Sequence, residues 1–214
     1  MKALHILYRK CLKSDTNFVL ALIRLIYIRL IFKKTFLLHQ KVIMKGIRNI
    51  QAYEKIEIGV EYVGFMHREE KTYLNISGKL IFKGNYKIGR GCRFDVGEDA
   101  TVIIGKGGYV NCNTSIIIMN KLIIGNDCAI SWNCQFLDND FHTISYANKK
   151  EISNSIEIGD HVWIGSGVKI YKGTKILDGC VIASDSVVKK AFDKKNCLIG
   201  GNPAKILVEN IQWK

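Results

Sequence analysis

From Ile58 onward, apolar residues return every six positions along the chain. The pattern shifts phase three times and ends in its longest unbroken run. That run consists of Ile158, Ile164, Ile170, Ile176, Ile182 and Val188. A period of six is neither helical nor the alternation of one long strand. It predicts short strands that each end in a corner. Three such sides close one coil of eighteen residues, which is the spacing from Ile58 to Ile76 and from Ile158 to Ile176.

A second position, four residues after the aliphatic one, holds small or β-branched residues. They are Cys92, Thr114, Cys128, Cys134, Val162, Val168, Thr174, Cys180 and Ser186. We expect the aliphatic residue to fill the axis of a prism and the small residue to lie beside it at a corner. Four of the seven cysteines occupy this position and are interpreted as core fillers. No CxxC pair and no zinc-finger spacing is present, so no metal site is expected.

A single coil cannot bury its apolar side, so the coils must stack and the ends need caps. We therefore divide the chain into three parts. Residues 58–192 form the solenoid, residues 1–57 a basic and partly helical N-terminal arm, and residues 193–214 a C-terminal cap.

The formal net charge of +13 is concentrated in the arm. Residues 1–50 contain eleven Lys or Arg and one acid, Asp15, which gives +10 and leaves +3 for the remainder. Such an arm favours an anionic surface, membrane headgroups before nucleic acid, although a merely solvated arm is the alternative. No nucleic-acid partner is expected.

The segment Phe18–Phe32 is apolar but only fifteen residues long, and Arg24 and Arg29 interrupt it. A spanning helix needs about 20 mostly apolar residues. An interfacial helix, a helix packed on the chain's own core and one packed on a neighbouring subunit all remain open. Since the N-terminus lacks a secretory signal pattern, we expect a cytoplasmic protein, held peripherally at the inner membrane face if the arm binds lipid.

The block IEIGDHVWIGSGVKIYKGTKILDGCVIASDSVV, the later GGNPAKIL and a His-bearing insertion together resemble the hexapeptide-repeat acyltransferases. Maltose and galactoside O-acetyltransferases and capsule or O-antigen acetyltransferases are the most similar members. The resemblance covers roughly residues 58–210. It implies an all-β, left-handed parallel β-helix, although parallel crossovers are normally right-handed. It also implies a homotrimer that transfers acetyl from acetyl-CoA to a sugar hydroxyl in surface polysaccharide biosynthesis.

The repeat breaks between Phe136 and Ile158, where a polar loop at 137–157 interrupts it. In relatives such a loop carries the catalytic histidine, which makes His142 the candidate general base. A sugar hydroxyl is a weak nucleophile, and histidine can remove its proton near neutral pH and later protonate the leaving thiolate. A carboxylate on the other ring nitrogen would fix the tautomer. Glu151 matches the family's supporting glutamate, and Asp140 is the alternative nearer in sequence.

The resemblance also implies the remaining site residues, with acetyl-CoA lying in a groove between two subunits. Trp163 would contact the pantetheine or the acetyl end, and the backbone at Gly165–Ser166 and Ala183–Ser184 would bind the pantetheine amides. Ser166 would polarise the thioester. The CoA phosphates would meet three lysines: Lys189, Lys190 and Lys205. On the acceptor side the candidates are Asn113 and Asp138. For Asn113 a tight left-handed corner is an equally good interpretation.

Three other functions are alternatives. N-acetylation of an amino-sugar nucleotide usually requires an N-terminal βαβ unit, which residues 1–57 do not resemble. Serine acetylation requires a longer helical domain. A non-catalytic β-helix scaffold would need neither the His142 loop nor the lysines.

Overall fold

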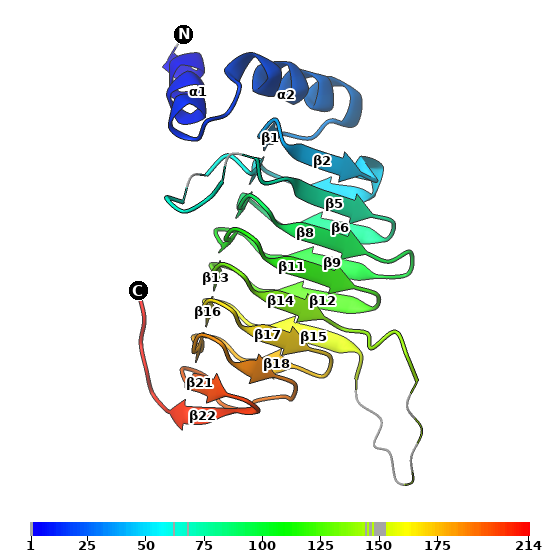
Figure 1. The fold of residues 1–214 in the computed structure, drawn as a ribbon, viewed down its shortest axis with the longest axis vertical. Coiled ribbons are helices and arrows are strands. Elements are labelled where there is room, and N and C mark those ends of the chain that lie inside the picture. The colour runs from blue at the N-terminus through cyan, green and yellow to red at the C-terminus, as the bar shows by residue number, and fades with distance from the viewer. Residues whose placement is uncertain (1, 62, 68, 144, 146, 148–152) are drawn as a thin grey trace.

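The computed structural model describes residues 2–61, 63–67, 69–143, 145, 147 and 153–214. Its short strands stack into three parallel sheets, arranged as in a left-handed β-helix, with two helices at the N-terminal end (Figure 1). The predicted fold class is therefore confirmed.

Along most of the chain, each coil contributes one strand to each sheet. Sheet A runs β1 (Phe36–Leu38), β4 (Ile56–Ile58), β7 (Tyr86–Ile88), β10 (Tyr109–Val110), β13 (Ala129–Ile130), β16 (Trp163–Ile164), β19 (Val181–Ile182), β21 (Leu198–Gly201) and β22 (Ala204–Val208). Sheet B runs β2 (Val42–Lys45), β5 (Thr72–Ile76), β8 (Arg93–Val96), β11 (Ser115–Ile118), β14 (Gln135–Leu137), β17 (Lys169–Tyr171) and β20 (Val187–Val188). Sheet C contains β3 (Ile50–Ala52), β6 (Lys79–Phe82), β9 (Thr101–Ile104), β12 (Lys121–Ile124), β15 (Ser155–Ile158) and β18 (Lys175–Ile176). The regular coils run up to β18, and the C-terminal end then adds β19, β21 and β22 to sheet A and β20 to sheet B.

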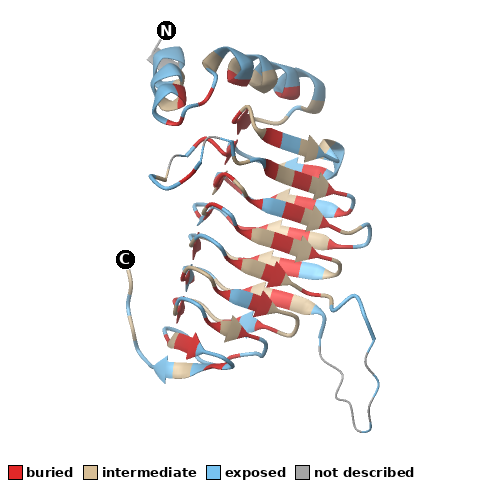
Figure 2. Ribbon diagram, viewed as in Figure 1, coloured by how far each residue is buried: buried red, intermediate tan, exposed pale blue. Residues whose placement is uncertain are grey.

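The core is the inside of this prism, and Figure 2 shows buried and exposed residues alternating along the strands. The aliphatic and the small positions of the repeat are both buried, as predicted. All seven cysteines are buried free thiols. Burial raises the pKa of Cys92 to about 12 and those of Cys128 and Cys134 to about 11. Since the thiolate is the reactive form, these side chains act as apolar core residues.

The eighteen-residue coil holds for only part of the chain. Ile158 pairs with Ile176 in sheet C, as expected. Ile58 instead pairs with Ile88 in sheet A, while Ile76 lies in sheet B. An excursion of the chain over residues 59–71 separates β4 from β5 and lengthens that coil.

The solenoid also begins earlier and ends later than the predicted 58–192. β1, β2 and β3 pair in parallel with β4, β5 and β6, so the first coil starts at Phe36. All three residues of β1 are buried, so the in–out alternation that marks other strands is absent there. At the other end β21 pairs in parallel with β19, and β22 turns back on it antiparallel.

The N-terminal cap consists of α1 (Lys2–Lys13) and α2 (Phe18–Phe32), and a short 3-10 turn, η1 (Ile47–Asn49), lies in the first coil. Arg24 of α2 donates to the carbonyls of His39 at 3.0 Å and Val42 at 2.9 Å. The buried Arg90 donates to the carbonyls of Ser14 and of Gly59. One face of α2 therefore packs on the chain's own core, which was one of the three alternatives for this helix.

Candidate active site

The loop that interrupts the repeat leaves sheet B after β14 and returns to sheet C at β15. His142 is exposed on this loop. Asp140, one of its two predicted partners, forms an ion pair with Lys172 at 2.7 Å instead. The other, Glu151, lies outside the described residues.

Asp138 is the first residue of the loop after β14. Its carboxylate accepts the backbone N–H groups of Met119, Asn120 and Lys121 at 2.7–2.8 Å, and the residue is 0% exposed. A carboxylate that is buried and already hydrogen-bonded to three backbone N–H groups is inaccessible to a sugar. The prediction that Asp138 binds substrate is therefore wrong; it fastens the loop to the preceding coil.

The corner between sheets A and B, here called the A–B corner, brings two of the predicted CoA segments together. The turn after β16 stacks directly on the turn after β19, with Asp185 N–H donating to Ser166 O at 2.9 Å. The hydroxyls of Ser166 and Ser184 are 3.2 Å apart. A Cβ on Gly165 would meet Ser184 N at 2.7 Å, so only glycine permits this close stacking. The corner thus presents hydroxyls and backbone groups in register from two coils. The backbone groups of Ala183 are among them.

Trp163 lies on the outer face of sheet A, 42% exposed, and its indole donates to Ser131 Oγ at 3.3 Å. The C-terminal tail returns to this place. Trp213 stacks on His161 with ring centroids 4.0 Å apart, and its indole lies 6.1 Å from that of Trp163. Sequence reasoning missed Trp213, because an isolated tryptophan outside the repeat carries no pattern.

The three predicted phosphate-binding lysines converge. Lys189, Lys190 and Lys205 line one pocket of about 400 Å³ together with Pro203 and Ala204. We call this the lysine pocket. Lys189 and Lys190 directly follow β20, and Lys205 lies on β22, so the C-terminal hairpin brings together residues that are separated in sequence.

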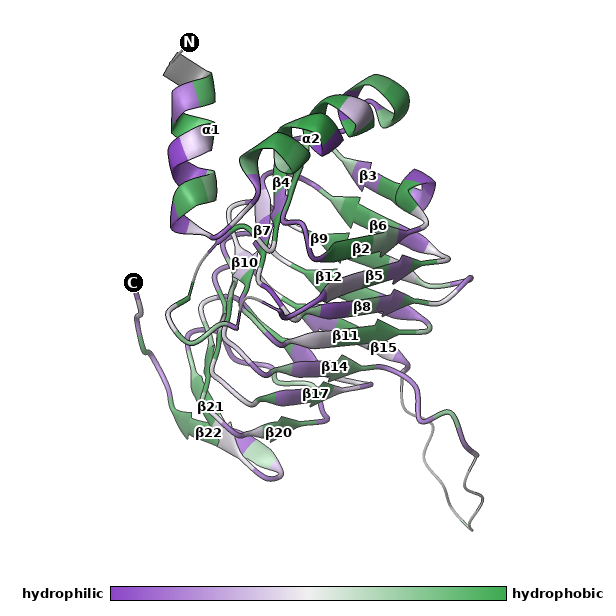
Figure 3. Ribbon diagram, turned by 45° about the horizontal axis from the view of Figure 1, so that its top comes forward, coloured by the Kyte–Doolittle hydropathy of each residue, from purple (hydrophilic) through white to green (hydrophobic). Residues whose placement is uncertain are grey.

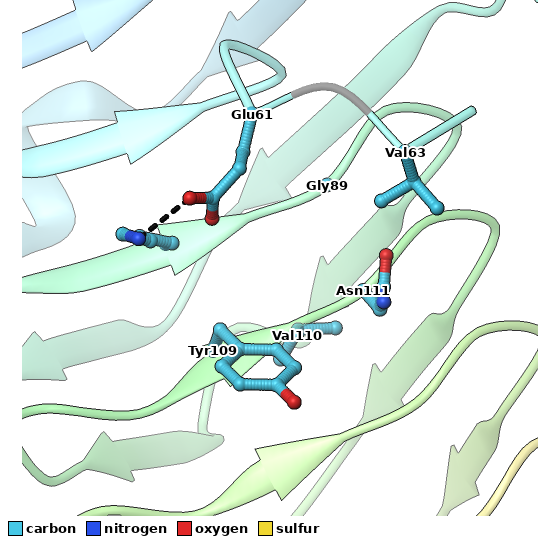
Figure 4. A pocket seen from close by; sticks show the side chains of 7 residues that line it. Glu61, Val63, Gly89, Tyr109, Val110 and Asn111 are labelled. Carbon is cyan, nitrogen blue, oxygen red and sulfur yellow. Dashed lines mark hydrogen bonds and ion pairs between the residues drawn. The ribbon is translucent and has the colours of Figure 1, made fainter. Parts of the chain in front are cut away.

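Asn113 occupies the same A–B corner on an earlier coil. It adopts a left-handed backbone with φ +59°, which confirms the tight-corner interpretation. Its side-chain amide also lies 3.5 Å from Glu70 of the 59–71 excursion. Asn111, two residues earlier in the chain, lines a pocket of about 380 Å³ between that excursion and sheet A (Figure 4). Tyr109, Asn111 and an ion pair between Lys87 and Glu61 at 2.6 Å line this pocket, so its walls can hydrogen-bond a polar ligand.

The two halves of the predicted site lie apart within one chain. Trp163 is on sheet A, which Figure 1 draws at the left of the solenoid, whereas the loop that begins after β14 projects at the right. Figure 3, turned by 45°, shows the same separation. One chain therefore presents the candidate base and the candidate CoA groove on different edges.

Comparison with known proteins supplies the family. An uncharacterized 24.8 kDa protein in the cps region of Klebsiella pneumoniae is 36% identical over 216 residues, spanning all of this chain and 97% of that protein. Residues 155–190 match the bacterial transferase hexapeptide (six repeats) family. The chain belongs to the bacterial hexapeptide-repeat transferases.

Two solved structures resemble this hexapeptide-repeat transferase. The polySia-specific acetyltransferase NeuO is 24% identical with a TM-score of 0.49, over 85% of this chain and 78% of its own. A galactoside acetyltransferase in complex with coenzyme A is 28% identical with a TM-score of 0.43, over 50% of this chain and 55% of its own.

Proposed function

We propose that this hexapeptide-repeat transferase moves an acetyl group from acetyl-CoA to a hydroxyl of a saccharide, in the biosynthesis of a surface polysaccharide. The observation that carries the proposal is the lysine pocket, which lies at the end of the coils that carry the A–B corner. Family membership and a full-length relative from a cps region support it.

The lysine pocket and the A–B corner offer the groups that acetyl-CoA needs for binding. Three ammonium groups around one pocket suit the phosphates of CoA, because Lys is a common point-charge ligand of phosphate. The amides of pantetheine need donors and acceptors in an extended row, which the stacked turns at Ser166 and Ser184 offer. Trp163 and Trp213 would flank the acetyl end.

In the proposed reaction, the acceptor oxygen attacks the thioester carbon of acetyl-CoA. His142 takes the hydroxyl proton as the new C–O bond forms. The C–S bond then breaks, and His142 returns the proton to the leaving thiolate, so the enzyme ends unchanged. General base assistance of this kind contributes about 10²- to 10⁴-fold. The buried cysteines have raised pKa values and would remain outside this chemistry.

His142 needs a carboxylate partner, and Glu151 is the stronger candidate because Asp140 is already paired with Lys172. Replacing the true partner should lower kcat and change the pH dependence of the rate. We expect this of Glu151→Gln and expect Asp140→Asn to be near wild type. The reverse pattern would assign the role to Asp140.

We further propose that the site is completed between copies of the chain in a homotrimer. The His142 loop and the A–B corner are on different edges of one solenoid, so the loop of one copy would reach the corner of the next. The pocket lined by Asn111, two residues before Asn113, is the proposed acceptor side.

The test is a thiol-release assay with purified protein and acetyl-CoA, across a panel of saccharides and amino sugars. Mass spectrometry of surface glycans with and without the gene would identify the acceptor. We expect thiol release that depends on a hydroxyl acceptor. The rate of His142→Ala should be lower than that of the wild type by a factor of about 10² or more. Release only with amino sugars would favour N-acetylation. Failure to bind CoA would favour the scaffold interpretation.

A further inference from the structure

One face of α2 is apolar and uncovered. It consists of Val19, Leu20, Ile23, Ile26, Tyr27, Leu30 and Ile31. Their side chains are between 40% and 72% exposed. The spacing of three and four residues places them along one side of the helix. Figure 3 shows α2 hydrophobic over almost its whole length.

Folding of the chain does not account for this face. The opposite side of α2, with Ala21 and Ile28 buried, packs on the first coil, and Arg24 hydrogen-bonds to that coil. α2 lies across the end of the solenoid (Figure 1), so its exposed side points away from the coils. A contiguous apolar surface of this kind on a soluble domain usually marks an interaction site.

Basic residues surround the apolar face. α1 adds exposed Leu4, Tyr8 and Leu12 along one of its sides, interleaved with the cations Arg9 and Lys13. Arg29 lies on the rim of α2 and Lys33 at its C-terminal end, and both are exposed. With one acid in residues 1–50, a second copy docked here would bring like charges together.

We propose that the exposed faces of α1 and α2 bind the surface of an anionic phospholipid bilayer, with α2 lying in the plane of the interface. Apolar side chains would enter the boundary between headgroups and acyl chains, and the cations would meet lipid phosphates. In the part of the chain that the structure describes, neither helix meets the length and hydropathy that a membrane span requires.

The experiment is flotation of the full-length protein with phosphatidylcholine vesicles that contain, or lack, phosphatidylglycerol. One variant removes cations from the cap (Arg9→Gln, Lys13→Gln, Arg29→Gln). A second removes apolar contacts (Ile23→Ser, Ile26→Ser, Leu30→Ser). A matched control removes three exposed cations from the sides of the solenoid (Lys121→Gln, Lys169→Gln, Lys175→Gln).

We expect binding to anionic vesicles that weakens in 1 M salt, where the screening length falls from about 10 Å to about 3 Å. The cap-cation variant should lose on the order of 10- to 100-fold in affinity, since each basic residue contributes about fivefold near an anionic surface. The apolar variant should lose binding as well, and the control variant should match wild type.

Equal loss in the cap-cation and control variants would overturn the proposal, as would equal binding to vesicles without anionic lipid. A smaller oligomer in the apolar variant, measured by light scattering without lipid, would also overturn it, because a second copy would then cover the face. Circular dichroism of each variant verifies that the fold is retained.

Discussion

At the scale of the residue, the buried carboxylate of Asp138 connects the solenoid to the loop that carries His142. It accepts three backbone N–H groups of the preceding coil and leaves no face open to solvent. A buried donor that loses its acceptor bears its full desolvation cost. The residue therefore stabilises both the coil and the starting point of the loop.

Asp138→Ala should lower the free energy of unfolding by about 1–3 kcal/mol, because three partly buried backbone N–H groups lose their acceptor. Asp140→Ala is the matched control: its carboxylate is exposed in a surface ion pair, so the expected change is below about 1 kcal/mol. Urea denaturation measures both. Equal effects would mean that the buried hydrogen bonds contribute little.

The seven cysteines give a second prediction. All are buried, and burial raises the pKa of the Cys112 thiol to about 11, as it raises those of Cys92, Cys128 and Cys134. An alkylating reagent at pH 8 should therefore label the native protein slowly and reach all seven thiols in denaturant. Intact-protein mass spectrometry counts the adducts. Rapid labelling of a thiol in the native protein would show that its coil opens.

Residue-level prediction from the sequence was good where the repeat fixed the position. The burial of Cys92, Cys128, Cys134 and Cys180 follows directly from period six, whereas the segments at Ser166 and Ser184 came from the family resemblance. Asp138 was misjudged because its sequence context, a polar loop, is also the context of a ligand. Its actual partners lie one coil away, and only the stacking of coils shows them.

At the scale of the element, the N-terminal cap is held by buried polar contacts. His39 is buried directly after β1 in the first coil, and its ring bonds at 3.1 Å to the carbonyl of Asp15, which lies between α1 and α2. Its other ring nitrogen accepts from Lys41 N–H. Burial, aided by the Arg90 cation, lowers the pKa of His39 to about 4.

This shift makes the cap sensitive to acid. A histidine whose pKa is lower in the folded state stabilises the fold fully above its unfolded pKa of about 6.5. That contribution falls as the pH drops from about 6.5 towards 4. The loss should reach about 3 kcal/mol. Urea denaturation between pH 7 and 4.5 should show this slope in the wild type and a flatter one in His39→Gln. If the stability of His39→Gln fell with pH as steeply as that of the wild type, His39 would not be the cause of the acid sensitivity.

The cap also explains why the first coil escaped prediction. Strands are recognised by alternation, and β1 loses it because the cap covers its outer side, as the burial of Phe36, Leu37 and Leu38 shows. The excursion at 59–71 then interrupts the phase of the repeat. The helices themselves were partly foreseen from the apolar run Phe18–Phe32, but which surface each face contacts depends on tertiary packing.

At the scale of the whole molecule, a site shared between copies predicts complementation. His142→Ala and the triple variant Lys189→Gln, Lys190→Gln, Lys205→Gln should each be nearly inactive alone. Trimers assembled from both chains would contain an interface with a wild-type loop facing a wild-type groove. Co-expression with two affinity tags and the thiol-release assay measure this. Inactive mixed trimers would mean that each site is built within one chain.

The regular stacking of the coils has a consequence for the acceptor. Neighbouring strands of a sheet are about 4.8 Å apart, and β16 is separated from β1 by four strands of sheet A, so the two lie about 24 Å apart along the axis. With the cap resting on lipid, the solenoid would add this distance to the thickness of the cap and so hold the proposed site well above the bilayer. A glycan still attached to its lipid carrier would then be modified on sugars far from the anchor. Those next to the membrane would pass beneath the site.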